Sequence, residues 1–225
     1  MKVKDFISYL ENGELATAFD KFSDADDYQM LLSNINVSLL TLYTDLPLLE
    51  KHVYLQRFPH IANYVLDSRY AVSNTRSTEI YKYILDTEEN PFQDDVIAIR
   101  FAYTPFGEIM INDYNNPTRS WFVSGKTIQI PNTMLCGEIA SVCYQAKHPE
   151  VFSPDDELQI PEFITEGFLA YVSSRMFLTR TDERASQLAA NYLEKYKSEV
   201  DRVRENNLLS QFTVTNIRPI RGGWV

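Results

Sequence analysis

Glycine, cysteine and long hydrophobic runs are all scarce in this sequence. Its 225 residues include only 7 Gly and 2 Cys, and no stretch reaches the roughly 18 consecutive apolar residues that a membrane span needs. Cys136 and Cys143 lie too close together to form the disulfide framework of a small secreted protein, so we expect reduced structural thiols. The first residues also lack the apolar run of a secretory signal. We therefore expect a protein made in the cytoplasm, without a membrane partner.

Positive charge is deficient as well. The chain has 21 Lys and Arg against 31 Asp and Glu, which gives a formal charge of −10. Proteins that grip nucleic acid neutralise phosphates with clustered basic residues, so this balance disfavours that class. An acidic wall would suit a conduit instead, because like charge keeps a polyanion from sticking to it. With 44% hydrophobic residues the chain can still bury a conventional core.

The sequence also lacks a recognisable metal site. His52, His60 and His148 are scattered, and no two of them share one turn of a helix. A zinc site from Cys136, Cys143 and His148 would have loose spacing and no fourth ligand, so buried thiols are the better interpretation. We expect no metal and no cofactor.

One tetrapeptide, Ser124-Gly125-Lys126-Thr127, looks like the end of a phosphate-binding loop. The full pattern needs a glycine five positions before Gly125, where this chain has Ser120. The flanking residues favour strands on both sides, whereas a phosphate loop leads into a helix. We therefore expect a hairpin turn here.

Paired carboxylates are the remaining candidates for chemistry, and we expect them to be solvated or structural rather than catalytic. Asp94 and Asp95 come just before a β-rich stretch, where they are expected to form a turn. A pair in a glycosidase must face across a cleft at ~5–10 Å, which adjacent residues do not do by themselves. We predict no catalytic residue among the four pairs, which are Asp26-Asp27, Glu88-Glu89, Asp94-Asp95 and Asp155-Asp156.

Three stretches have the apolar period of amphipathic helices. The first runs from Ser23 to Tyr43 and stops before Pro47, because proline removes a backbone donor and restricts the preceding residue. The second opens at Pro161, and the third follows Thr181-Asp182 after a short link, which favours antiparallel packing of the pair. Their apolar positions are Tyr28, Leu32, Ile35, Leu39 and Leu42; Phe163, Ile164, Phe168, Tyr171 and Val172; and Ala185, Leu188, Ala189, Tyr192, Tyr196, Val200 and Val203.

Between the helical ends the sequence changes to short β-branched and aromatic runs separated by turn residues. Residues 96–103 and 109–111 flank Thr104-Pro105-Phe106-Gly107, which predicts a β-hairpin. Residues 121–123 and 127–130 predict a second one. The stretch from Glu138 to His148 alternates in a way that favours another strand.

These elements predict an α+β fold, in which an antiparallel helical bundle comes from both chain ends, a β-rich insertion lies between them, and an extended C-terminal tail follows. The expected boundaries are residues 1–46 and 160–207 for the bundle, 47–159 for the insertion and 208–225 for the tail. The tail contains proline, two glycines and an apolar tip, so it must dock on something or stay loose.

Three groups of segments carry a family resemblance. The first is Asn12-Gly13-Glu14-Leu15 with the helix at 28–43 and the segment 44–51. The second is 92–97 with 143–149. The third combines 160–163, 167–172, 192–196 and the closing Gly223-Trp224-Val225. Together they make the chain resemble the head-to-tail adaptors of short-tailed bacteriophages, the tail tubular protein A group.

The resemblance implies a structural virion protein of the tail or neck, made in the bacterial host cytoplasm and without enzymatic activity. It implies a ring, dodecameric in that family, that joins the portal protein to the tail nozzle or tail fibre proteins. Genomic DNA would pass through the ring without sequence-specific binding. The C-terminal extension would dock on neighbouring subunits or the portal. The residues expected at these interfaces are Tyr192, Tyr196, Ile217, Arg218, Ile220, Arg221, Trp224 and Val225.

Three alternatives stay open at this point. The chain would also suit another virion connector or tail-completion protein. A carboxylate-dependent hydrolase acting on cell wall would use Asp94 and Asp95. A free-standing protein-binding domain of bacterial origin is the third alternative.

Overall fold

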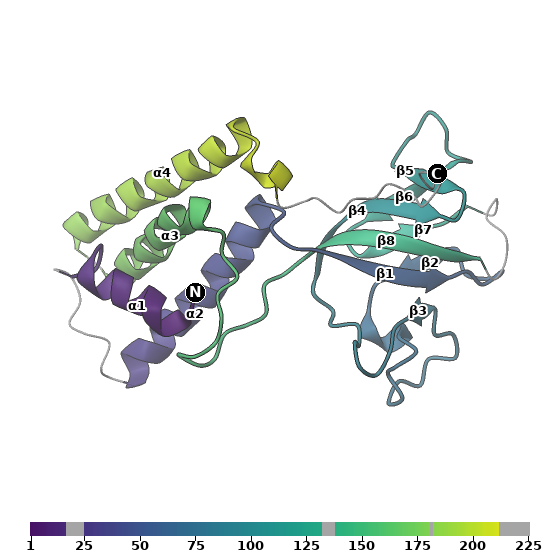
Figure 1. Cartoon of the computed structure of the whole chain (residues 1–225), viewed down its shortest axis with the longest axis horizontal. Coiled ribbons are helices and arrows are strands. Elements are labelled where there is room, and N and C mark those ends of the chain that lie inside the picture. Colours follow the sequence, from purple (N-terminus) through teal and green to yellow (C-terminus); the bar gives the residue numbers. More distant parts are fainter. Residues whose placement is uncertain (17–24, 132–137, 181, 212–225) are drawn as a thin grey trace, which may run out of the picture. The chain divides into compact units, whose positions relative to one another are not determined.

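The computed structural model describes residues 1–16, 25–131, 138–180 and 182–211 (Figure 1). The chain divides into two compact units. The helical unit contains the described residues of Met1–Leu48 and His148–Val214, and the sheet unit contains those of Leu49–Lys147.

The helical unit is built around a closely packed pair of helices, α3 and α4, which lie side by side in Figure 1. Gly167 on α3 makes this approach possible, because a Cβ there would lie only 3.0 Å from the Cβ of Glu199 on α4. Asp182 caps α4 by accepting a hydrogen bond from the N–H of Ala185 at 2.7 Å. The helices described are α1 (Val3–Asn12), α2 (Ala25–Asp45), α3 (Thr165–Leu178) and α4 (Glu183–Glu205), with short 3-10 turns at Glu162–Ile164 and Leu208–Gln211.

The remaining two helices pack on this pair. The rings of Phe6 on α1 and Phe168 on α3 are 5.0 Å apart and both side chains are buried. On α2, the amide of Asn36 both donates to and accepts from the backbone of Val151, at 2.9 Å each. No helix in the described part of the chain is long and apolar enough to cross a membrane.

The sheet unit holds one eight-stranded sheet in the order β2-β7-β6-β5-β4-β8-β1-β3. All neighbouring strands pair antiparallel except β5 and β6, which are parallel. The strands are β1 (Glu50–Gln56), β2 (Asn63–Val65), β3 (Ile84–Leu85), β4 (Val96–Thr104), β5 (Gly107–Ile111), β6 (Ser120–Ser124), β7 (Thr127–Gln129) and β8 (Ile139–Ala146).

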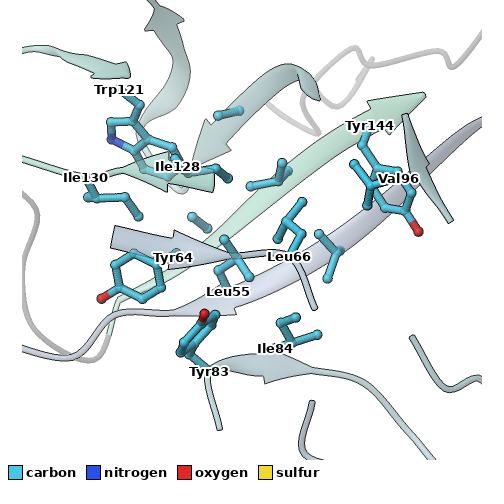
Figure 2. Close-up of a cluster of buried hydrophobic side chains, with 14 of the residues drawn as sticks. Leu55, Tyr64, Leu66, Tyr83, Ile84, Val96, Trp121, Ile128, Ile130 and Tyr144 are labelled. Carbon is cyan, nitrogen blue, oxygen red and sulfur yellow. The ribbon is translucent and has the colours of Figure 1, made fainter. Parts of the chain in front are cut away.

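The sheet curls around its own core, which brings β2 from one end of the strand order near the segment that leads into β3 at the other end. Figure 2 shows side chains from both ends, including Tyr64 and Tyr83, in one buried cluster. The two rings are 4.9 Å apart, edge to face. The hydroxyl of Tyr83 bonds to the backbone of Val65 in β2, so a side chain bridges the two ends where no strand does.

The predicted fold class is wrong. We expected an antiparallel helical bundle from both chain ends with a β-rich insertion between them, but the structure is a mixed α+β fold in which the eight-stranded curled sheet dominates. The sequence did not reveal this sheet because some of its strands are very short and others pair with strands that are distant in the sequence. Strands β2 and β3 have three and two residues, and β1 pairs with β8 some ninety positions later. No local pattern signals such pairings.

Several local predictions are confirmed. The helix expected in 23–43 occurs from Ala25 onward, residues 23 and 24 lying outside the described residues. The paired helices after Pro161, the 96–111 hairpin and the strand in 138–148 also occur. Ser124 pairs with Thr127 and Gly125 has a φ of 57°, so the tetrapeptide at 124–127 is a hairpin turn and not a phosphate loop. Helix α1 was not predicted.

Candidate interaction surfaces

Two of the predicted interface residues lie in the described part of α4, and both contact their own unit. Tyr196 is only 3% exposed, and its ring packs 4.6 Å from that of Tyr171. The ring of Tyr192 is half-buried and stacks on Phe177 at 5.7 Å. Tyr196 therefore offers little surface to a neighbouring subunit. The other predicted interface residues, Ile217, Arg218, Ile220, Arg221, Trp224 and Val225, lie outside the described residues.

Asp45, at the end of α2, ties the C-terminal half of α4 to the rest of the helical unit. The hydroxyl of Tyr196 donates to its carboxylate at 2.7 Å, and the guanidinium of Arg204 donates to its backbone carbonyl at 2.8 Å. Burial and the Asp45 carboxylate raise the pKa of Tyr196, so the phenol stays protonated and keeps donating. The start of the C-terminal tail is thereby fixed near the start of the linker that leads into β1.

Asp94 and Asp95, the carboxylates that a hydrolase would use, make structural contacts instead. Asp94 has a φ of 56°, and its carboxylate accepts from the N–H of Ser68 at 2.6 Å. The Asp95 carboxylate accepts from Lys51 at 2.6 Å and from the Tyr144 hydroxyl at 3.0 Å. Each of these carboxylates therefore fixes a loop or strand of its own unit, as expected for residues that form a turn. This arrangement gives no support to the hydrolase.

The histidine and cysteine side chains are not gathered into a metal site either. Among the residues the structure describes, no group of three His, Cys, Asp or Glu could hold a metal ion. His148 is buried, with Nε2 accepting from the N–H of Gln159 at 3.0 Å and Nδ1 placed 2.5 Å from the carbonyl of Pro149. Burial lowers its pKa, so it is neutral at pH 7. Cys136 lies outside the described residues, and Cys143 is a buried free thiol.

The β4–β5 hairpin exposes large apolar side chains. Phe106 in the turn is 79% exposed and Met110 on β5 is 62% exposed. Both line a hollow of about 570 Å³ together with Ile109, Arg119 and the buried Trp121. Exposed apolar groups around a hollow are typical of protein–protein contact sites, where an aromatic anchor of a partner can be desolvated. We call this the hairpin hollow.

A second apolar surface lies on the face of the sheet opposite its core. Register places Tyr54 of β1 and Tyr103 of β4 on either side of Ser141 in β8, and Phe101 beside Cys143. The core-facing residues of β8 are the alternating positions 140, 142, 144 and 146, so the positions between them face the other way. Tyr54 and Phe101 are partly or largely exposed on this face. The sequence alone does not distinguish these exposed aromatic positions from those in the core.

Beside the first part of β1 lies a hollow of about 470 Å³, the β1-edge hollow. Its floor and rim include the whole length of Glu50 to Tyr54, together with Phe92, Tyr144 and Asp86. Burial alone would raise the pKa of Asp86, but hydrogen bonds from the hydroxyl and N–H of Ser73 and from the N–H of Phe92 outweigh it and lower that pKa. The hollow therefore keeps an ionised carboxylate at its rim at neutral pH.

No protein-family model matches the chain, and no curated protein is similar to it at a significant level.

Proposed function

We propose that this chain is a structural virion protein, a head-to-tail adaptor that forms a ring between the portal and the tail of a bacteriophage. The family resemblance in three parts of the sequence motivates the proposal. The hairpin hollow is the structural observation that carries it, because exposed apolar side chains such as Phe106 and Met110 beside a hollow are typical of sites that bind another protein.

A ring requires two different, complementary surfaces on each copy, because its contacts are head to tail. The hairpin hollow and the aromatic outer face of the sheet are two such surfaces on one unit. The tail from residue 208 onward, with Arg218, Arg221 and Trp224, would add contacts to a neighbouring subunit or to the portal. The tail nozzle or tail fibre proteins would bind the opposite side of the ring.

The charge of the chain suits a channel for DNA. Each copy brings a formal charge of −10, so a closed ring concentrates negative charge around its opening. Like charge raises the energy of DNA bound to the wall and favours free passage. This argument concerns movement through the ring and needs no sequence-specific contact.

Another virion connector or a tail-completion protein would share the same kind of surfaces and would differ in location. The hydrolase is less well supported, because Asp94 and Asp95 are both engaged in contacts that fix the fold.

The proposal is tested by removing the apolar character of the hairpin hollow. We expect the double variant Phe106→Ser, Met110→Ser to fold normally and to lose self-association, measured by sedimentation velocity in the presence of portal. The matched control is Leu178→Ser, which removes another exposed apolar side chain from the end of α3. Equal assembly by the double variant and the wild-type chain would contradict the role of this hollow.

A further inference from the structure

One edge of the sheet is left without a partner strand over half its length. The residues that flank β1 bond toward β8: the N–H of Ala146 donates to the carbonyl of Leu49, and the N–H of Arg57 donates to the carbonyl of Glu138, just before β8. Antiparallel pairs alternate in this way, so the even-numbered residues of β1 direct their N–H and C=O groups to the other side. The N–H of Gln56 accordingly donates to Tyr83 on that side.

Strand β3 covers only the second half of this side. Its pairing with β1 is confined to Tyr54 and Leu55, after which the chain leaves at Asp86 to form the rim of the β1-edge hollow. The backbone groups of Glu50 and His52 therefore face the hollow, with no hydrogen bond from any residue that the structure describes. Unpaired edge groups of this kind are a template for another strand.

At the other end of the sheet a side chain covers part of the edge. The outward N–H and C=O of Val65 in β2 are both satisfied by the hydroxyl of Tyr83, at 2.8 and 2.9 Å. Tyr83 thus covers Val65 at that end, whereas the outward groups of Glu50 and His52 face a hollow of about 470 Å³. That volume lies within the ~300–1,000 Å³ range of sites that hold ligands.

The sequence contains a strand-forming segment outside the described elements. Residues 212–217 read Phe-Thr-Val-Thr-Asn-Ile, with apolar and β-branched residues in alternation. Such a pattern is typical of a strand, and the following Arg218-Pro219 ends it.

The segment can reach this edge in its own copy. Arg204 and Tyr196 hold the end of α4 against Asp45, which precedes Glu50 by five residues. Glu205 ends α4 and Leu208–Gln211 form a 3-10 turn that rises only ~2 Å per residue, so residue 212 starts close to the end of α4. The four residues 46–49 between Asp45 and Glu50 keep the start of β1 within ~17 Å of Asp45. Both segments leave the same end of the helical unit, so the added strand would run parallel to β1.

We propose that residues 212–217 add as a strand to the open edge of β1 at Glu50 and His52 of the same copy. The inference does not depend on the proposed adaptor function. The added strand would anchor the base of the C-terminal tail and leave residues 218–225 free to contact another molecule. The recognition is strand addition, in which main-chain hydrogen bonds supply affinity and side chains in the hollow supply specificity.

The test is amide hydrogen exchange at His52, measured on the isolated chain at a low concentration. We expect this N–H to exchange at least about tenfold more slowly in the full chain than in a chain that ends at Gln211. The double variant Val214→Pro, Thr215→Pro should lose the protection, because one of two consecutive residues must donate to β1 and proline has no N–H. The matched control Val214→Thr, Thr215→Val keeps both β-branched residues and should keep the protection.

Equal exchange at His52 in the full and shortened chains would overturn the proposal, as would protection that survives the two prolines. Protection that falls on dilution would assign the strand to another copy and overturn it as stated. The adaptor proposal can fail on its own, because this measurement involves neither portal nor ring.

Discussion

The hydroxyl of Tyr83 donates to the carbonyl of Val65 at 2.9 Å and accepts from the N–H of the same residue at 2.8 Å. One side chain thus satisfies the outward backbone groups of Val65, which a neighbouring strand would otherwise pair with. Burial is the first cause that raises the pKa of Tyr83, which keeps the phenol neutral so that it can donate and accept at once.

Replacing Tyr83 with Phe leaves both backbone groups of Val65 without this partner in a buried region. We expect a loss of about 1–3 kcal/mol in the free energy of unfolding, measured with urea. The control is Tyr114→Phe, since the Tyr114 side chain is 79% exposed. Equal stability of the Tyr83→Phe chain and the wild type would show that water replaces the hydroxyl at no cost.

Asp86 fastens the loop that borders the β1-edge hollow. Asp86→Asn removes a charge that accepts from Ser73 and Phe92, so we expect a loss of about 1.5–3 kcal/mol at pH 7. Because the pKa of Asp86 is lowered by folding, its contribution is present at neutral pH and is lost as the pH falls from ~4 through the folded-state value. The difference from wild type should therefore shrink in acid. Glu88→Gln, at an exposed position, serves as the control.

His148 should make the helical unit sensitive to mild acid. Its pKa is lowered by burial, so the unfolded chain binds a proton first, near pH ~6.5. We expect the free energy of unfolding to fall from pH 7 downward by up to ~1.4 kcal/mol per pH unit until the folded-state pKa is reached. The fall should be absent in His148→Gln. An identical pH profile for the two chains would contradict this account.

The thiol of Cys143 should be unreactive in the folded protein. Burial raises its pKa to about 11, with the Glu50 carboxylate as a further cause, so only about a thousandth of it is ionised at pH 8. In a Cys136→Ser background, reaction with a thiol reagent at pH 8 should be at least ~100-fold slower than in urea. Equal rates in the two conditions would show that this thiol is accessible and ionised in the fold.

The sequence predicts those elements that form between residues close together in the chain. The apolar period from Tyr28 to Leu42 predicts α2, and the turn residues at 104–107 and 124–127 predict two hairpins. The sheet as a whole could not be predicted, because its centre depends on β8 pairing with both β1 and β4 across long stretches of chain.

The surfaces show a similar division. Tyr196 was expected at an interface because of the family resemblance, yet Asp45 and Tyr171 enclose it, which only the tertiary structure reveals. Phe106 follows Pro105 in a turn and so had a sequence signal for exposure, but its place beside Met110 and Trp121 depends on the curl of the sheet. The open edge at His52 follows from the shortness of β3, which no residue pattern announces.

The central claim, a ring that joins portal to tail, is tested most directly by imaging the purified protein mixed with the portal by electron microscopy. The account predicts a closed ring of copies seated on one face of the portal, coaxial with its channel. The account would be contradicted if the chain stayed monomeric and did not bind the portal, at concentrations at which assembled virions keep the protein bound.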